Sequence, residues 1–176
     1  MTVRFRLNGE QQTIRAPADT RLADLLRENF ALTAAKTACR IGRCGSCLVL
    51  MNGHAVNSCL LMAWQIEGAD IVSPEALGAL PEGRVVREAL VAEVAFQCGY
   101  CAPGFAVALT ALLRRRPDAE EGEIRAALGG NICRCTGYSS ILRGAALAQR
   151  LLRGETSGSS AQRVETDSMA IDPKRT

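Results

Sequence analysis

The eight cysteines of this chain fall into two groups of four. The first group spaces its first three members as C-x4-C-x2-C, and consists of Cys39, Cys44, Cys47 and Cys59. This is the spacing of plant-type [2Fe–2S] sites, in which one tight loop wraps the cluster and supplies three thiolates. Gly42 and Gly45 suit such a loop because glycine adopts positive φ and permits close backbone approach. The spacing therefore predicts a [2Fe–2S] site, although the fourth cysteine follows sooner than in other plant-type ferredoxins.

The second group combines a C-x2-C pair with a C-x-C pair, and consists of Cys98, Cys101, Cys133 and Cys135. Alone, this spacing is less specific. If each pair lies between two helices, however, four thiolates can converge on one buried point. A helix N-terminus follows each pair in this arrangement, and its positive dipole end favours an anionic cluster. We therefore predict a second [2Fe–2S] site here.

Other uses of cysteine compete with this interpretation. Structural zinc sites usually take two C-x2-C pairs, and the first group does not offer them. A zinc-stabilised interaction module remains an alternative for the chain. Disulfides require an oxidising compartment, whereas the N-terminal segment has no apolar signal region and no apolar run approaches membrane-spanning length. We therefore expect a cytoplasmic protein that does not enter membranes.

The net charge of +3 is mild and the basic residues are scattered. No basic stripe with interleaved aromatic residues is present, which argues against a nucleic-acid partner. One histidine, His54 at a predicted turn, cannot organise a catalytic triad. The sequence therefore offers no catalytic residues of its own.

The first half predicts a small α+β unit. Residues 3–7 alternate apolar and polar side chains, and a turn then leads to a partner strand over 12–14. Thr20 is a candidate cap for a helix whose leucines share one face. A second hairpin is predicted from 48–51 and 55–56.

The second half predicts four short helices, and the connection to it reads as a linker. The segment 69–83 carries two prolines, so we place a boundary near residue 75. The helices are expected over 84–96, from Pro103 to Arg116, from a capping box of Asp118 and Glu121 to Gly129, and over 138–153. The predicted organisation is thus one domain over 1–75, a second over 76–153, and a flexible tail over 154–176.

Three stretches, CRIGRCGSC, QCGYCAPG and EIRAALGGNICRCTGY, resemble the small iron–sulfur subunit of the molybdenum hydroxylases. That family includes xanthine dehydrogenases, aldehyde oxidoreductases and carbon monoxide dehydrogenases, and the resemblance covers roughly residues 2–152. It implies an α+β chain in which an N-terminal β-grasp plant-type ferredoxin domain precedes a C-terminal four-helix [2Fe–2S] domain. All eight cysteines match the family's cluster ligands.

The resemblance also implies a function for the chain within an oxidoreductase complex. A large subunit would hold the molybdenum–pterin cofactor (molybdopterin) and hydroxylate a small N-heterocycle, an aldehyde or CO. Electrons would pass through the helical domain's cluster and the ferredoxin domain's cluster to FAD on a medium subunit. The implied assembly is a heterotrimer or a dimer of heterotrimers. A free-standing two-cluster carrier, or a relay to a cytochrome, is the alternative.

Two residues are implied to touch the pterin, namely Gln97 and Cys135. For Gln97, the alternative is a residue at a helix C-terminus that bonds its own backbone. The sequence departs from the family at Ala38, Ser46 and Ala102, and also in the stretch after residue 72. None of these departures removes a ligand, but each can alter hydrogen bonding near a sulfur.

Overall fold

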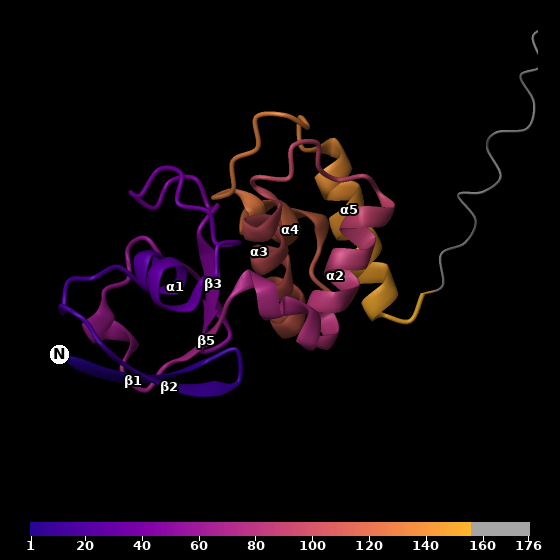
Figure 1. The fold of residues 1–176 in the computed structure, drawn as a ribbon. Coiled ribbons are helices and arrows are strands. Elements are labelled where there is room, and N and C mark those ends of the chain that lie inside the picture. Colours follow the sequence, from indigo (N-terminus) through magenta and orange to yellow (C-terminus); the bar gives the residue numbers. More distant parts are fainter. Residues whose placement is uncertain (156–176) are drawn as a thin grey trace, which may run out of the picture.

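The computed structural model describes residues 1–155 and consists of a sheet-bearing half followed by a helical half (Figure 1). This confirms the predicted α+β class with a ferredoxin-like unit first. The predicted tail lies outside the described residues apart from its first two positions. Among the residues described, no helix has both the length and the apolarity that crossing a bilayer requires.

The first half is a five-stranded mixed sheet with one helix packed on it. The strand order is β2-β1-β5-β3-β4, and β1 pairs with β5 in parallel whereas the other pairs are antiparallel. The elements are β1 (Thr2–Leu7), β2 (Glu10–Arg15), α1 (Leu22–Phe30), β3 (Leu48–Met51), β4 (His54–Asn57) and β5 (Asp70–Val72). A short 3₁₀ turn, η1 (Ala63–Ile66), precedes β5.

Alternation along the strands decides which face each side chain meets. In β1, Val3, Phe5 and Leu7 are buried while the residues between them are exposed, as a half-buried strand requires. These three side chains share a core with the leucines of α1. Both predicted hairpins are therefore confirmed. The predicted cap is wrong, because the residue before α1 is Arg21 and not Thr20, and it makes no side-chain capping bond.

The interpretation of 69–83 as a linker is wrong. β5 joins the two hairpins from a central position in the sheet, and η2 (Pro74–Ala79) follows it at once. The Glu75 carboxylate accepts hydrogen bonds from the Ala34 N–H at 2.8 Å and the Ser73 hydroxyl at 2.7 Å. A strand of three residues is too short to show period-two alternation, and its neighbouring prolines and glycines dominate the pattern.

The second half contains the four predicted helices, with shifted bounds. They are α2 (Pro81–Ala92), α3 (Ala102–Arg115), α4 (Glu121–Leu128) and α5 (Ser139–Leu152). The first starts earlier than predicted because Pro81 fits the first turn, where its missing N–H has no partner to lose. It also ends earlier, because Val94 takes φ +47° and the Ala95 N–H closes on the Leu90 carbonyl at 2.9 Å.

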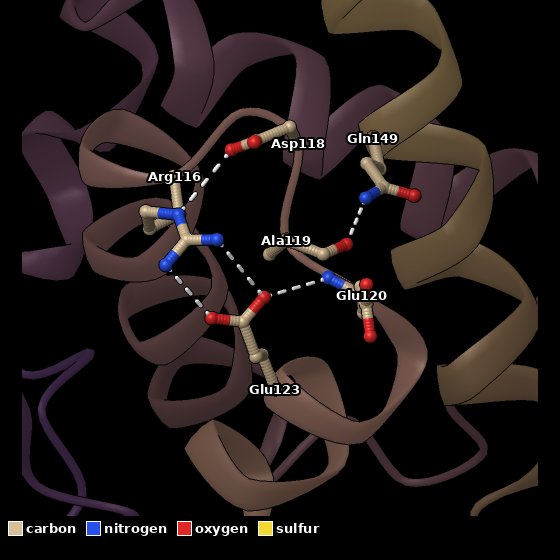
Figure 2. Close-up of polar contacts among 6 residues, drawn as sticks. All are labelled: Arg116, Asp118, Ala119, Glu120, Glu123 and Gln149. Atoms are coloured by element: carbon tan, nitrogen blue, oxygen red, sulfur yellow. Dashed lines mark hydrogen bonds and ion pairs between the residues drawn. The ribbon is translucent and has the colours of Figure 1, made fainter.

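The start of α4 is fixed by a network that Figure 2 shows in close-up. The capping box is formed by Glu120 and Glu123, so the predicted pair Asp118 and Glu121 is wrong. The Glu123 carboxylate accepts the Glu120 N–H at 2.8 Å and pairs with Arg116 at 3.0 Å. Gln149 of α5 donates to the Ala119 carbonyl, which ties α5 to the turn before α4.

The two halves share a boundary along β3. Val49 faces the core beneath α1, whereas Leu48 and Leu50 point the other way into the helical core beside α3. Both faces of this strand are therefore buried, which places the helical half directly against the sheet (Figure 1). Cys101 and Cys133 belong to the helical core, whereas Cys47 and Cys59 form a small separate cluster with Ala23 of α1.

Candidate iron–sulfur sites

The first three cysteines lie on a loop between α1 and β3 that needs several left-handed residues. Arg40, Gly42 and Gly45 have φ of +58°, +75° and +68°. The Arg40 guanidinium binds the Asp24 carboxylate of α1 at 2.6 and 2.7 Å. The Arg21 side chain donates to the Arg40 carbonyl at 2.9 Å. The loop is thus fastened to the start of α1 at its tightest point.

Backbone N–H groups of this loop point at the outermost sulfur. The Arg43 N–H donates to the Cys39 Sγ at 3.3 Å. The Ile41 N–H is the main cause that lowers the pKa of Cys39 to about 6, with the Cys44 thiol adding to it against the opposing effect of burial. Cys39 is therefore a thiolate at neutral pH, which is the form that binds metal.

The other two members of the first group lie deeper. Cys47 at the edge of β3 and Cys59 beyond β4 are buried and neighbour each other. Burial, followed by the adjacent Cys59, raises the pKa of Cys47 to about 11. The Ser58 hydroxyl donates to the Cys47 carbonyl at 2.7 Å and holds the two segments together. The first group is thus two sulfur pairs, one near the surface and one buried.

The second group forms between the helices where the sequence placed it. Cys101 is the residue before α3, and the C-x-C pair lies between α4 and α5. The Sγ atoms of Cys98 and Cys135 are 3.6 Å apart and exposed, whereas Cys101 and Cys133 neighbour each other in the interior. Each member of the C-x2-C pair therefore meets one member of the C-x-C pair.

Hydrogen bonding and burial have opposite effects on the thiol pKa values of the two inner cysteines, Cys101 and Cys133. Burial, together with its neighbour Cys133, raises the pKa of Cys101 to about 12. Burial also opposes ionisation of Cys133, but the Thr136 hydroxyl, which lies 3.2 Å from its sulfur, and nearby N–H groups outweigh it and lower the pKa to about 7. The Cys133 N–H itself donates to the Tyr138 phenol oxygen at 3.0 Å.

Sulfurs that meet in twos fit a dinuclear cluster better than a single ion. A tetrahedral zinc site brings four ligands around one ion, whereas the sulfurs here lie in adjacent pairs, such as Cys47 beside Cys59 and Cys98 beside Cys135. A [2Fe–2S] cluster instead takes two cysteines for each iron. Both groups provide two adjacent pairs, and N–H or hydroxyl donors face the sulfurs of each group, so the residues present fit such clusters.

Gln97 is exposed and lies beyond the end of α2, two residues after the buried Ala95. Among the described residues, its side chain makes no hydrogen bond to its own backbone. Gln97 instead shares the exposed edge of the second site with Cys98 and Cys135.

Comparison with known proteins agrees with these two sites. A family described as "2Fe-2S iron-sulfur cluster binding domain" matches residues 5–77, and one described as "[2Fe-2S] binding domain" matches residues 74–146. One of the subunits of a probable xanthine dehydrogenase from Bacillus subtilis is 43% identical over 151 residues, covering 86% of this chain and 87% of that protein. The chain belongs to the small [2Fe–2S] subunits of the molybdenum hydroxylases.

Further relatives support membership of this family. The nicotinate dehydrogenase small FeS subunit of Eubacterium barkeri is 40% identical over 141 residues, covering 80% of this chain and 90% of that protein. The crystal structure of quinoline 2-oxidoreductase from Pseudomonas putida 86 aligns with a TM-score of 0.79 and 34% identity, over 88% of this chain and 98% of that one. This molybdenum hydroxylase subunit is therefore part of an oxidoreductase, as its sequence predicted.

The sequence did not single out several residues that shape the sites. Thr136 and Tyr138 bond the sulfur and the N–H of Cys133, and Asn131 donates its side-chain amide to the Gly45 carbonyl at 3.2 Å. All three residues lie within the GGNICRCTGY stretch at 129–138, which resembles the family. Their polar side chains next to a ligand were the signal available.

Proposed function

We propose that this chain relays single electrons between two partner subunits through clusters held by its two cysteine groups. The ligands of one cluster are Cys39, Cys44, Cys47 and Cys59. The ligands of the other are Cys98, Cys101, Cys133 and Cys135. The observation that carries the proposal is the meeting of sulfurs in pairs at both sites, with N–H or hydroxyl donors around them.

The helical site is proposed to receive electrons from a molybdenum–pterin cofactor on a large subunit. Gln97 and Cys135 lie at the exposed edge of this site and are the proposed pterin contacts. Tyr100 and Ile132 are also exposed there, at 48% and 54%. Exposed apolar side chains beside a site that must exchange electrons favour a docked partner. A large subunit that covers this edge would bring its cofactor near Cys135.

The sheet-bearing site is proposed to pass electrons on to FAD in a medium subunit. Three apolar side chains are exposed in the sheet-bearing half, namely Ile41 at 62%, Leu60 at 51% and Trp64 at 59%. The first two flank Gly42, because a Cβ on that glycine would lie 2.4 Å from the Leu60 Cδ1. Exposed apolar side chains near this site as well favour a second docked partner, and therefore a heterotrimer or a dimer of heterotrimers.

The proposed compartment is the cytoplasm, where thiols stay reduced. All eight cysteines are free in the structure, and ligands to iron have to be thiolates. The substrate would be a small N-heterocycle, an aldehyde or CO, bound on the large subunit. The relatives named as xanthine and nicotinate dehydrogenase subunits are consistent with an N-heterocycle.

Two serine variants test the assignment of ligands to sites. Cys47→Ser and Cys135→Ser should each be expressed with the partner chains, and the reduced complexes examined by paramagnetic resonance. We expect each variant to lose a different [2Fe–2S] signal and to keep the other, since the four sulfurs of one group do not serve the other. If either variant kept both signals, or if both lost the same one, the assignment would be wrong.

A further inference from the structure

A backbone contact joins the two cysteine groups directly. The Ile132 N–H, immediately before Cys133, donates to the carbonyl of Cys44 at 3.0 Å. Cys44 and Cys133 are proposed ligands of different clusters. A single hydrogen bond therefore links the main chain of one ligand to the residue that adjoins the other.

Three residues hold this contact in place with little freedom. Asn131 is 4% exposed and donates its amide to the Gly45 carbonyl at 3.2 Å, next to the Cys44 carbonyl. A Cβ on Gly45 would lie 2.6 Å from the Asn131 amide nitrogen. A Cβ on Gly104, in α3, would lie 2.1 Å from the Gly45 carbonyl oxygen. The loop of the first site is thus packed against both α3 and the loop of the second site. The contact leaves no room for a side chain at Gly45 or Gly104.

The Asn131 side chain is retained at some cost. Its Oδ1 is buried and has no hydrogen-bond partner among the described residues. A buried polar atom left unpaired destabilises the folded state, because it gives up its hydrogen bonds to water without a replacement. Asn131 donates to the Gly45 carbonyl despite this penalty. This indicates that the position of the Gly45 carbonyl matters to the protein.

We propose that electrons cross between the two sites through the Ile132 N–H and the Cys44 carbonyl, and that Asn131 is a positioning residue for this crossing. The inference rests on the proposed function, because it requires both cysteine groups to hold clusters. One electron leaves the reduced helical site through the Cys133 thiolate, and that site is oxidised. The electron enters through the Cys44 thiolate, and the sheet-bearing site is reduced. No bond forms or breaks and no proton moves.

Removal of the N–H is the direct test, in the complex purified with its partner subunits. Ile132→Pro deletes the donor, while Ile132→Ala, the matched control, keeps it. The side chain is 54% exposed, so truncation costs little packing. One electron is injected by flash photoreduction, and its redistribution between the two clusters is followed by rapid-freeze paramagnetic resonance. We expect transfer several-fold slower in Ile132→Pro, an unchanged rate in Ile132→Ala, and full iron content in both. An unchanged rate in Ile132→Pro would overturn the proposal.

A second variant covers the case in which the proline variant loses iron. Asn131→Ala keeps every backbone N–H but frees the Gly45 carbonyl. Hydrogen exchange of the Ile132 amide should accelerate, and electron redistribution between the clusters should slow with it. Faster exchange with an unaltered transfer rate would contradict a role for the contact. A complex without two clusters would refute the proposed function, whereas protection of the Ile132 amide would still report on the contact itself.

Discussion

Replacing Gly104 by alanine tests how tightly the two halves are pressed together. In an ordinary helix interior this change stabilises, because alanine is favoured over glycine by about 1 kcal/mol. At Gly104 the added Cβ would lie 2.1 Å from the Gly45 carbonyl oxygen and 3.0 Å from its carbon. Both are backbone atoms of the first cysteine loop, and they cannot rotate away.

The expected magnitude follows from that overlap. Relief requires α3 or the loop to move by about 1 Å, and overpacking of this kind costs about 1–3 kcal/mol. The net effect is then a loss of up to about 2 kcal/mol, despite the gain in helix propensity. The matched control is Gly122→Ala in α4, where a Cβ meets nothing within 4 Å and should stabilise by up to about 1 kcal/mol.

Thermal unfolding of the cluster-loaded complex measures the difference between the two alanine variants. The two variants then differ by up to about 3 kcal/mol, which corresponds to up to roughly 6–12 °C in Tm for a chain of this size. Iron content should fall in the Gly104 variant as well, since the displaced loop carries three of the proposed ligands. A Tm for Gly104→Ala equal to that of Gly122→Ala would refute the close contact between the halves.

Further outcomes follow from backbone strain, charge and thiol ionisation. Val94 is a β-branched residue at φ +47° with a side chain 77% exposed, so Val94→Gly should stabilise the chain by about 1 kcal/mol, measured by denaturant unfolding. Asp24→Asn leaves the Arg40 charge uncompensated beside the first site, so redox titration should show a higher potential for that cluster alone. The free energy of unfolding should fall by less than about 1 kcal/mol. In the iron-free chain at pH 7.5, iodoacetamide should modify Cys39 well before Cys47, because a pKa of about 6 leaves the first as thiolate and one of about 11 keeps the second protonated. Peptide mass spectrometry gives the order, and lowering the pH through 6 should slow Cys39.

The sequence predicted those elements that carry strong local patterns. Alternation in β1, with Asn-Gly turns at residues 8–9 and 52–53, predicted the hairpins. Pro103 near the start and the arginines at 114–116 near the end predicted α3. The spacing of the cysteines predicts two groups of four, and the structure places their sulfurs in adjacent pairs, such as Cys47 beside Cys59 and Cys98 beside Cys135. These elements depend on residues that are close together in the sequence, so the sequence alone can predict them.

What the sequence could not predict depends on contacts between distant segments. β5 is a strand only because β1 and β3 pair with it on either side. The capping box starts at Glu120 and not at Asp118, because the Glu123 carboxylate binds both the Glu120 N–H and the Arg116 side chain. The contact from Ile132 to the Cys44 carbonyl required the two halves to be docked, and no spacing rule encodes it.

The content of iron and its magnetic signature test the central claim most directly. The complex, purified anaerobically with its partner subunits, should contain about four irons for each copy of this chain and show two distinct [2Fe–2S] signals after reduction by dithionite. About two irons with one signal, or zinc in place of iron in a colourless protein, would contradict a chain that carries electrons across two clusters.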